Sequence, residues 1–144
     1  MELIKNLIKE KGDEIWSIEP GASVFDAVKL MADKGVGALI VMKGNKLEGV
    51  ISERDYARKV ILKNRLSRET SVEEIMTTRV VYAHPEQNVE ECMALMTEKH
   101  IRHLPIMAEE KLLGVVSIGD LVKSIIAQQQ LTIKQLEQYV SGDW

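Results

Sequence analysis

The chain has 144 residues, 45% hydrophobic and 28% charged, with a formal net charge of -3 at pH 7. This length fits one compact domain, and the composition is ordinary for a soluble globular protein. The slight negative charge does not attract nucleic acid or an anionic membrane, and no run approaches the roughly 20 apolar residues that cross a bilayer. We therefore expect a cytoplasmic protein that binds neither nucleic acid nor membrane.

Cysteine and metal chemistry are not expected. Cys92 is the single cysteine, which excludes an intramolecular disulfide and agrees with a reducing compartment. Because no second thiol or activating partner lies near it in the sequence, we interpret Cys92 as a small apolar residue on a helix face. No cluster of His, Cys or carboxylate side chains has the spacing of metal ligands, so no metal is predicted.

The chain begins with a helical segment and continues with a repeat. Residues 1–14 have acidic side chains and a period near four, which indicates an amphipathic helix and not a targeting peptide. The first copy of the repeat spans residues 15–64 and the second spans residues 80–128. Residues 20–55 return without a gap as residues 85–120, 65 positions later. A repeated sequence predicts a repeated structural unit.

Each copy predicts the order strand, helix, strand, strand, helix. A short apolar run (15–18, then 80–83) precedes a proline, and the helix that follows has apolar residues at i, i+3, i+4 and i+7. Ser23 and Asn88 are the expected N-caps of these helices. Two apolar runs around a polar turn then predict a β-hairpin in each copy. We expect the last helix of each copy to begin at Tyr56 and at Leu121 and to end near residues 62 and 130.

Two segments lie outside the copies. Residues 65–79 form a linker in which Ser71 and Glu74 cap a short helix that runs through Met76. Residues 129–144 are predicted to form a separate, weakly amphipathic helix and tail that covers the domain or a dimer partner. Because each copy of roughly 60 residues buries too little apolar surface alone, we expect the two copies to share one core.

Both hairpins end in the pattern Gly-apolar-apolar-Ser-x-x-Asp, at residues 49–55 and 114–120. Ser-x-x-Asp before a helix is a capping box, in which side chains satisfy the first backbone amides. The same geometry places a hydroxyl at the positive end of a helix, which suits a phosphate. It also places there a carboxylate that can accept hydrogen bonds from both hydroxyls of a ribose. Capping and ribonucleotide binding are compatible, so both interpretations stay open.

These motifs, together with residues 72–77 (VEEIMT) and 102–106 (RHLPI), make residues 15–127 resemble a tandem pair of CBS domains. CBS domains are the cystathionine β-synthase-type regulatory modules that bind adenosine-containing ligands. Residues 51–56 further resemble small stand-alone CBS-pair proteins. The resemblance implies an α+β fold of two intertwined β-α-β-β-α motifs, related by a pseudo-twofold axis, that form one module with two clefts. It also implies a homodimer of such modules.

The resemblance implies roles for the repeated polar residues. Asp55 and Asp120 would bind ribose, and Ser52 and Ser117 would contact phosphate or ribose. The clefts would be built across the copies. The expected lining opposite Asp55 is Tyr82, Ala83 and His84. The expected lining opposite Asp120 is Trp16, Ser17, Ile18, Gly37 and Ala38.

The basic residues differ between the copies. Arg54 is replaced by Gly119 in the second copy, and Arg102-His103 stand where the first copy has Gly37-Ala38. Because guanidinium groups bind phosphate bidentately, Arg54, Arg102 and His103 favour the Asp55 cleft as the stronger phosphate site. The alternatives are solvated arginines on the surface and a structural histidine.

We find no nucleophile beside a positioned base and no P-loop, so no enzyme activity is predicted. The expected function is a sensor in signal transduction that binds AMP, ADP, ATP or NAD(H) and regulates a partner protein. The arginines favour these ligands over the cationic S-adenosylmethionine. The alternative is a ligand-free structural module for dimerisation or an adaptor.

Overall fold

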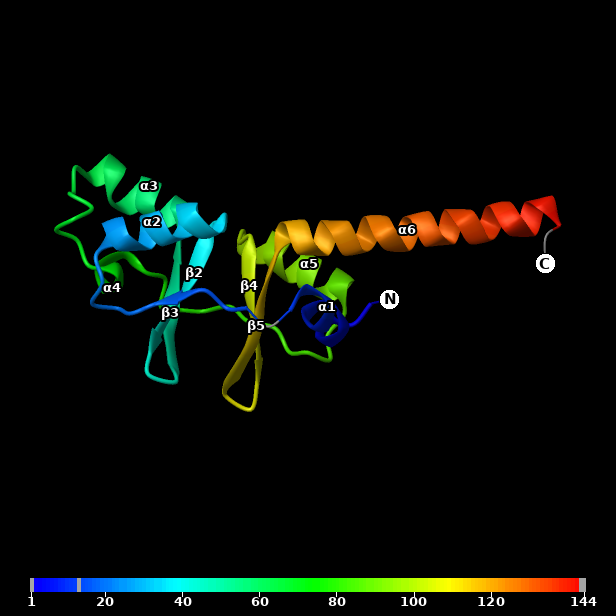
Figure 1. Cartoon of the computed structure of the whole chain (residues 1–144), viewed down its shortest axis with the longest axis horizontal. Coiled ribbons are helices and arrows are strands. Elements are labelled where there is room, and N and C mark those ends of the chain that lie inside the picture. Colours follow the sequence, from blue (N-terminus) through cyan, green and yellow to red (C-terminus); the bar gives the residue numbers. More distant parts are fainter. Residues whose placement is uncertain (1, 13, 143–144) are drawn as a thin grey trace. The chain divides into compact units, whose positions relative to one another are not determined.

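The structure is a computed structural model that describes residues 2–12 and 14–142 (Figure 1). The end of the predicted tail, residues 143–144, lies outside the described residues. Contacts divide the chain into two units, Glu14–Val80 and Met1–Asp13 with Val81–Trp144. We call them the first-copy unit and the second-copy unit. Each unit combines one copy of the repeat with the segment that precedes the other copy, and we call that segment its leader.

The first-copy unit contains a small mixed sheet with helices. Its elements are β1 (Ser17–Ile18), α2 (Val24–Lys34), β2 (Ala38–Lys43), β3 (Lys46–Ser52), α3 (Glu53–Lys59), the 3-10 helix η1 (Ile61–Lys63) and α4 (Val72–Ile75). The strand order is β1-β2-β3, with β1 parallel and β3 antiparallel to β2. The predicted cap of α2 is confirmed, because Ser23 Oγ accepts the Asp26 N–H at 3.1 Å. The helix ends at Gly35, whose φ of 66° favours glycine.

The second-copy unit repeats the hairpin and its helices. Its elements are α1 (Ile4–Lys11), α5 (Val89–Lys99), β4 (His103–Ala108), β5 (Lys111–Ser117) and α6 (Ile118–Ser141). The register of the two hairpins is the same: Ala38 pairs with Ser52, and His103 pairs with Ser117. Both hairpins are also irregular at equivalent positions, after Val41 and after Ile106. The predicted hairpins and the α+β class are therefore confirmed.

The strand predicted at residues 80–83 is wrong. In the described part of the second-copy unit, this segment forms one isolated parallel bridge, Ala83 to Ile106. The first copy has a further ladder bond here, from the Ile40 N–H to the Trp16 oxygen at 3.1 Å. The residue equivalent to Ile40 is Pro105, which has no N–H to donate. One missing donor reduces a short strand to a single bridge.

The buried residues form two hydrophobic clusters, one in each unit. Each cluster is completed by the leader. Val72 and Ile75 of α4 are buried in the first-copy unit, and Ile4 and Leu7 of α1 are buried in the second-copy unit. The exchange of leaders supplies the apolar surface that each short copy lacks.

The last helices begin earlier than predicted, and the final one is longer. α3 starts at Glu53 and α6 at Ile118, because the preceding serines serve as N-caps. α6 is one helix of 24 residues and not two. The glutamines at 128–130 do not interrupt it, since glutamine has a high helix propensity, and the helix continues to Gly142. No helix among the described residues is long and apolar enough to cross a membrane.

Candidate functional site

Each hairpin exit carries a complete capping box. In the first-copy unit the Ser52 N–H donates to Asp55 Oδ2 at 3.0 Å, and the Asp55 N–H donates to Ser52 Oγ at 3.2 Å. The Ser117 N–H and Asp120 Oδ2 are 2.8 Å apart, and the reciprocal bond to Ser117 Oγ is 3.1 Å. The capping interpretation is confirmed in both copies. The cap also fixes each carboxylate beside the first turn of a helix.

The capping carboxylates are mostly buried and each is paired with a lysine. The Asp55 side chain is 14% exposed and the Asp120 side chain is 22% exposed. Lys59 lies 3.1 Å from Asp55 Oδ1, and Lys11 lies 2.7 Å from Asp120 Oδ2. A lysine therefore balances the negative charge of both aspartates.

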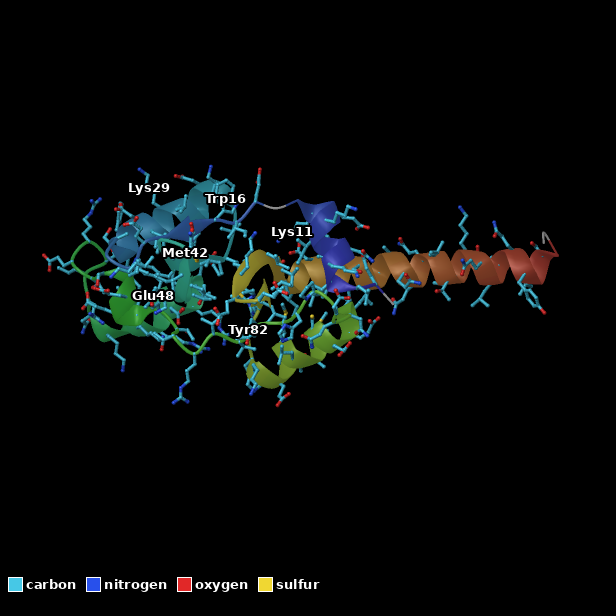
Figure 2. The ribbon with its side chains drawn as sticks, turned by 90° about the horizontal axis from the view of Figure 1, so that it is seen from below. Lys11, Trp16, Lys29, Met42, Glu48 and Tyr82 are labelled. Carbon is cyan, nitrogen blue, oxygen red and sulfur yellow. The ribbon has the colours of Figure 1, made fainter. Side chains whose placement is uncertain are left out.

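Lys11 holds Asp120 from another part of the sequence. It is the last residue of α1 (Figure 2), and its ammonium also donates to the Val115 oxygen at 2.8 Å. Burial raises the pKa of Asp120, but the hydrogen bonds from Lys11 and Ser117 and the charge of Lys11 outweigh it. The pKa of Asp120 is consequently lowered from its ordinary value. Lys11 thus links the leader helix to the hairpin exit.

Lys59 makes the corresponding contact within its own helix. It is four residues after Asp55 in α3, and it also donates to the Ile75 oxygen of α4 at 2.9 Å. Neither lysine was among the residues predicted for the site. The i,i+4 spacing was a signal for Lys59. No signal existed for Lys11, because 109 positions separate it from Asp120 and the equivalent residue of the other copy is not basic.

Each motif lies beside the start of the first strand of its own hairpin, β2 or β4. The Glu53 N–H donates to the Gly37 oxygen at 3.0 Å, next to the pairing of Ala38 with Ser52. The Ile118 N–H donates to the Arg102 oxygen at 2.9 Å, next to the pairing of His103 with Ser117.

The structure therefore brings Gly37 and Ala38 together with the Asp55 motif, and Arg102 and His103 together with the Asp120 motif. The expected linings across the copies, and the convergence of Arg102 and His103 with Arg54, concern both units at once and stay predictions.

The aromatic candidates already have partners. Trp16 precedes β1, and the ammonium of Lys34 lies 4.4 Å from its ring centroid. Ser17 and Ile18 form β1 itself. Tyr82 and His84 touch edge to face at 5.6 Å between ring centroids, on either side of the buried Ala83. Figure 2 labels Trp16 and Tyr82 in their respective units.

The other reactive groups do not form a site. Cys92 is buried, and burial together with the charge of Glu91 raises the pKa of its thiol to about 11. Its thiolate is therefore scarce at neutral pH. Within residues 2–12 and 14–142, no group of three or more His, Cys, Asp or Glu side chains is placed to hold a metal.

The repeated hairpins with capped exits agree with a family match. The family model of the CBS domain matches residues 8–62 and 72–127. The chain belongs to the CBS-domain family. A tandem pair of CBS domains is a regulatory module, and the predicted α+β fold of a CBS pair is confirmed.

Individual CBS-domain proteins match along most of the chain. The CBS domain-containing protein CBSX3, mitochondrial, of Arabidopsis thaliana is 36% identical over 98% of this chain and 73% of its own length. A solved protein with CBS domains from Burkholderia ambifaria is 51% identical, with a TM-score of 0.85 over 88% of this chain and 96% of its own.

A more distant CBS pair shares the fold. The CBS domain pair of protein MJ0100, solved with 5'-methylthioadenosine and S-adenosyl-L-methionine, is 22% identical. Its TM-score is 0.78 over 89% of this chain and 98% of its own. Both small molecules bound to that protein contain adenosine.

Proposed function

We propose that this CBS pair is a non-catalytic sensor that binds an adenosine-containing ligand through the ribose-binding carboxylates of Asp55 and Asp120. The observation that carries the proposal is the repetition of one geometry. Both units hold a mostly buried aspartate in a complete capping box at the hairpin exit. A cap alone does not require a buried acid, because capping residues function well on exposed helix ends.

The orientation of Asp120 suits a diol. Among the described residues, all of its hydrogen-bond donors contact Oδ2, so Oδ1 is available to accept a hydroxyl. A carboxylate held in this way can accept hydrogen bonds from neighbouring ribose hydroxyls. Asp55 uses Oδ2 for Ser52 and Oδ1 for Lys59, so a ribose there shares the second oxygen with the lysine.

The lysines favour an anionic ligand. Lys11 and Lys59 neutralise the two carboxylates and leave no net negative charge to attract a cation. Together with Arg54, Arg102 and His103 they support AMP, ADP, ATP or NAD(H) over a cationic sulfonium compound. The MJ0100 pair supports the adenosine part of the ligand, which its two bound molecules share. No metal is part of the proposal.

The output of the module is regulation. Ligand binding would favour one arrangement of the two copies and so change a surface that a partner protein recognises in signal transduction. We also retain a homodimer and a cytoplasmic location as predictions. Size measurement and cell fractionation test them separately from the ligand.

Thermal unfolding with added ligand tests the proposal. We expect one or more of AMP, ADP, ATP and NAD(H) to raise the melting temperature, with a stabilisation of about 2.7 kcal/mol at a hundredfold excess over the dissociation constant. The nucleotide would then be analysed after incubation with the protein, and we expect no chemical conversion of it. If no adenosine compound shifts the melt, S-adenosylmethionine included, the sensor is excluded and a ligand-free structural or adaptor module remains.

A further inference from the structure

The distal part of α6 carries an apolar stripe that its own unit does not cover. Val122, Ile126, Ile133, Leu136 and Val140 are between 41% and 84% exposed. In both views α6 extends beyond α1 and α5 of the same unit (Figures 1 and 2). Single exposed apolar residues are ordinary, but several of them in a row along one helix indicate an interaction surface.

The stripe has the spacing of a coiled coil. Ile126, Ile133 and Val140 are seven residues apart, at heptad position a, and Val122 and Leu136 occupy position d. The remaining d position is the exposed Gln129. Apolar residues at a and d form the buried seam between two coiled-coil helices, and a polar residue at one core position limits the register.

A different side of α6 packs on its own unit. Leu121 is fully buried, Ile125 packs against the second-copy cluster, and Ser124 Oγ donates to Glu2 Oε2. These residues occupy heptad positions c, g and f. The stripe begins about 100° around the helix from Leu121. It is therefore a second surface and not the continuation of the packed one.

The stripe also borders a shallow hollow near the helix end, whose lining is Ile133, Leu136, Glu137, Val140 and Ser141. A hollow between apolar side chains accepts a side chain from a facing helix, as the holes of a coiled coil accept knobs. The heptad spacing and the hollow thus indicate the same kind of partner, another helix with a matching stripe.

We propose that this stripe binds the same stripe of a second copy of the chain, as an antiparallel two-stranded coiled coil. In this arrangement position a faces position d, so that Ile126 lies opposite Leu136 of the second copy. Val140 then lies opposite Val122 of the second copy. The pairing uses the full stripe in both chains and closes on itself, as a twofold interface requires.

Charge complementarity selects the antiparallel direction. Lys123 and Glu137 both flank the stripe at heptad position e. In the antiparallel pair e positions meet, and Lys123 comes level with Glu137 of the second copy at both ends. In a parallel pair Lys123 would lie beside Ile118 and Glu137 beside Thr132, with no ion pair. Charges at e and g positions determine the orientation of coiled coils.

Charge substitutions on two sides of the helix test the surface. Ile133→Lys places a charge in the stripe, and Leu131→Lys places the same charge at position f, off the stripe, where exposure is similar. By sedimentation equilibrium of the full chain, we expect Ile133→Lys to weaken self-association at least tenfold and Leu131→Lys to leave it unchanged. If a different face also pairs copies, the expected change is from tetramer to dimer.

Crosslinking tests the direction. Lys123→Cys and Glu137→Cys variants would be mixed with a short bis-maleimide crosslinker, while Cys92 stays buried in both. We expect a covalent dimer in the mixture and none from either variant alone, since equal positions are about 21 Å apart along the antiparallel pair.

Three results would overturn the proposal. The first is equal self-association of the wild-type chain, Ile133→Lys and Leu131→Lys. The second is a dimer crosslinked from either cysteine variant alone, which would indicate parallel helices. The third is binding of the wild-type chain to anionic phosphatidylserine vesicles that Ile133→Lys abolishes without any change in mass, which would assign the stripe to a lipid surface.

Discussion

The two leaders cover equivalent hairpins in different ways. α4, the helix of the leader in the first-copy unit, has four residues and ends at Ile75. The chain then extends, and Thr77 exchanges backbone hydrogen bonds of 2.8 and 3.0 Å with Val50 of β3. α1, the helix of the leader in the second-copy unit, has eight residues and continues as a helix to Lys11.

This difference changes which atoms cover the hairpin of each unit. Gly49 of β3 lies under the backbone of Thr77, whereas the equivalent Gly114 of β5 lies under the Ile8 side chain. The longer helix also carries Lys11 to Asp120, which α4 is too short to do for Asp55. The equivalent glycine of the two hairpins is thus covered by backbone in one unit and by a side chain in the other.

The largest expected effect is the substitution of these glycines. A Cβ at Gly49 would lie 2.6 Å from the Thr77 oxygen, while a Cβ at Gly114 would lie 3.1 Å from Ile8 Cγ2. Because the backbone of Thr77 cannot move without losing its hydrogen bonds, we expect Gly49→Ala to destabilise the protein by about 1–3 kcal/mol. Gly114→Ala should cost less, since Ile8 can shift. Equal urea midpoints for the two variants would contradict the comparison.

Removal of the lysines should have the next largest effect. Lys11→Met leaves the mostly buried Asp120 without its ion pair, and we expect a loss of about 1 kcal/mol and faster amide exchange in α1. Lys59→Met, the matched control, leaves the similarly buried Asp55 without its ion pair and should also cost about 1 kcal/mol, but it should not change amide exchange in α1. If amide exchange in α1 is unchanged in Lys11→Met, then Lys11 does not hold the leader.

Thiol labelling compares the opening of the two units. Cys92 and the equivalent Ala27 are both fully buried. We expect Cys92 of the wild-type chain to react with a thiol reagent at neutral pH at least tenfold more slowly than in the urea-unfolded chain, since its pKa is about 11. A thiol in the Ala27→Cys/Cys92→Ala variant should react more slowly still, because the backbone pair of Thr77 and Val50 resists opening. The opposite order would reverse our comparison.

The smallest expected effect is the acid dependence of stability. The pKa of Asp120 is lowered in the folded state, so its contribution is fully present above the ordinary value of 3.8. It is lost as the pH falls below that value, because the unfolded chain then binds the proton more readily. In Lys11→Met this part of the slope should be reduced between pH 4 and pH 2, roughly the range below the ordinary aspartate pKa. Parallel slopes in urea unfolding would show that Lys11 does not lower the pKa.

Much of the fold could be predicted because the repeat carries it. The caps at Ser23, Asn88, Ser52 and Ser117 are local, since four consecutive residues contain both partners of each bond. The hairpins follow from alternating apolar runs with the same register in both copies. The bridge at Ala83 was also open to prediction, because Pro105 is visible in the sequence as a position without an N–H.

The contacts that could not be predicted join distant parts of the chain. Lys11 and Asp120 meet only because α1 packs on the second copy. The sequence around either residue does not indicate this packing. The sequence also suggested a helix end near the glutamines at 128–130, whereas the uninterrupted α6 depends on the absence of a helix-breaking residue. The packing of each leader on the other copy determines which residues meet. This packing is tertiary structure and does not follow from local sequence.

Isothermal titration with a ribonucleotide and its 2'-deoxy form tests whether Asp55 and Asp120 bind the ribose of an adenosine ligand. We predict that the wild-type chain binds AMP at least tenfold more tightly than 2'-deoxy-AMP. The difference should shrink in Asp55→Asn and in Asp120→Asn and disappear in the double variant, in which asparagine still accepts the serine N–H. Equal affinity of the wild-type chain for the two nucleotides would contradict the account and leave the aspartates as helix caps alone.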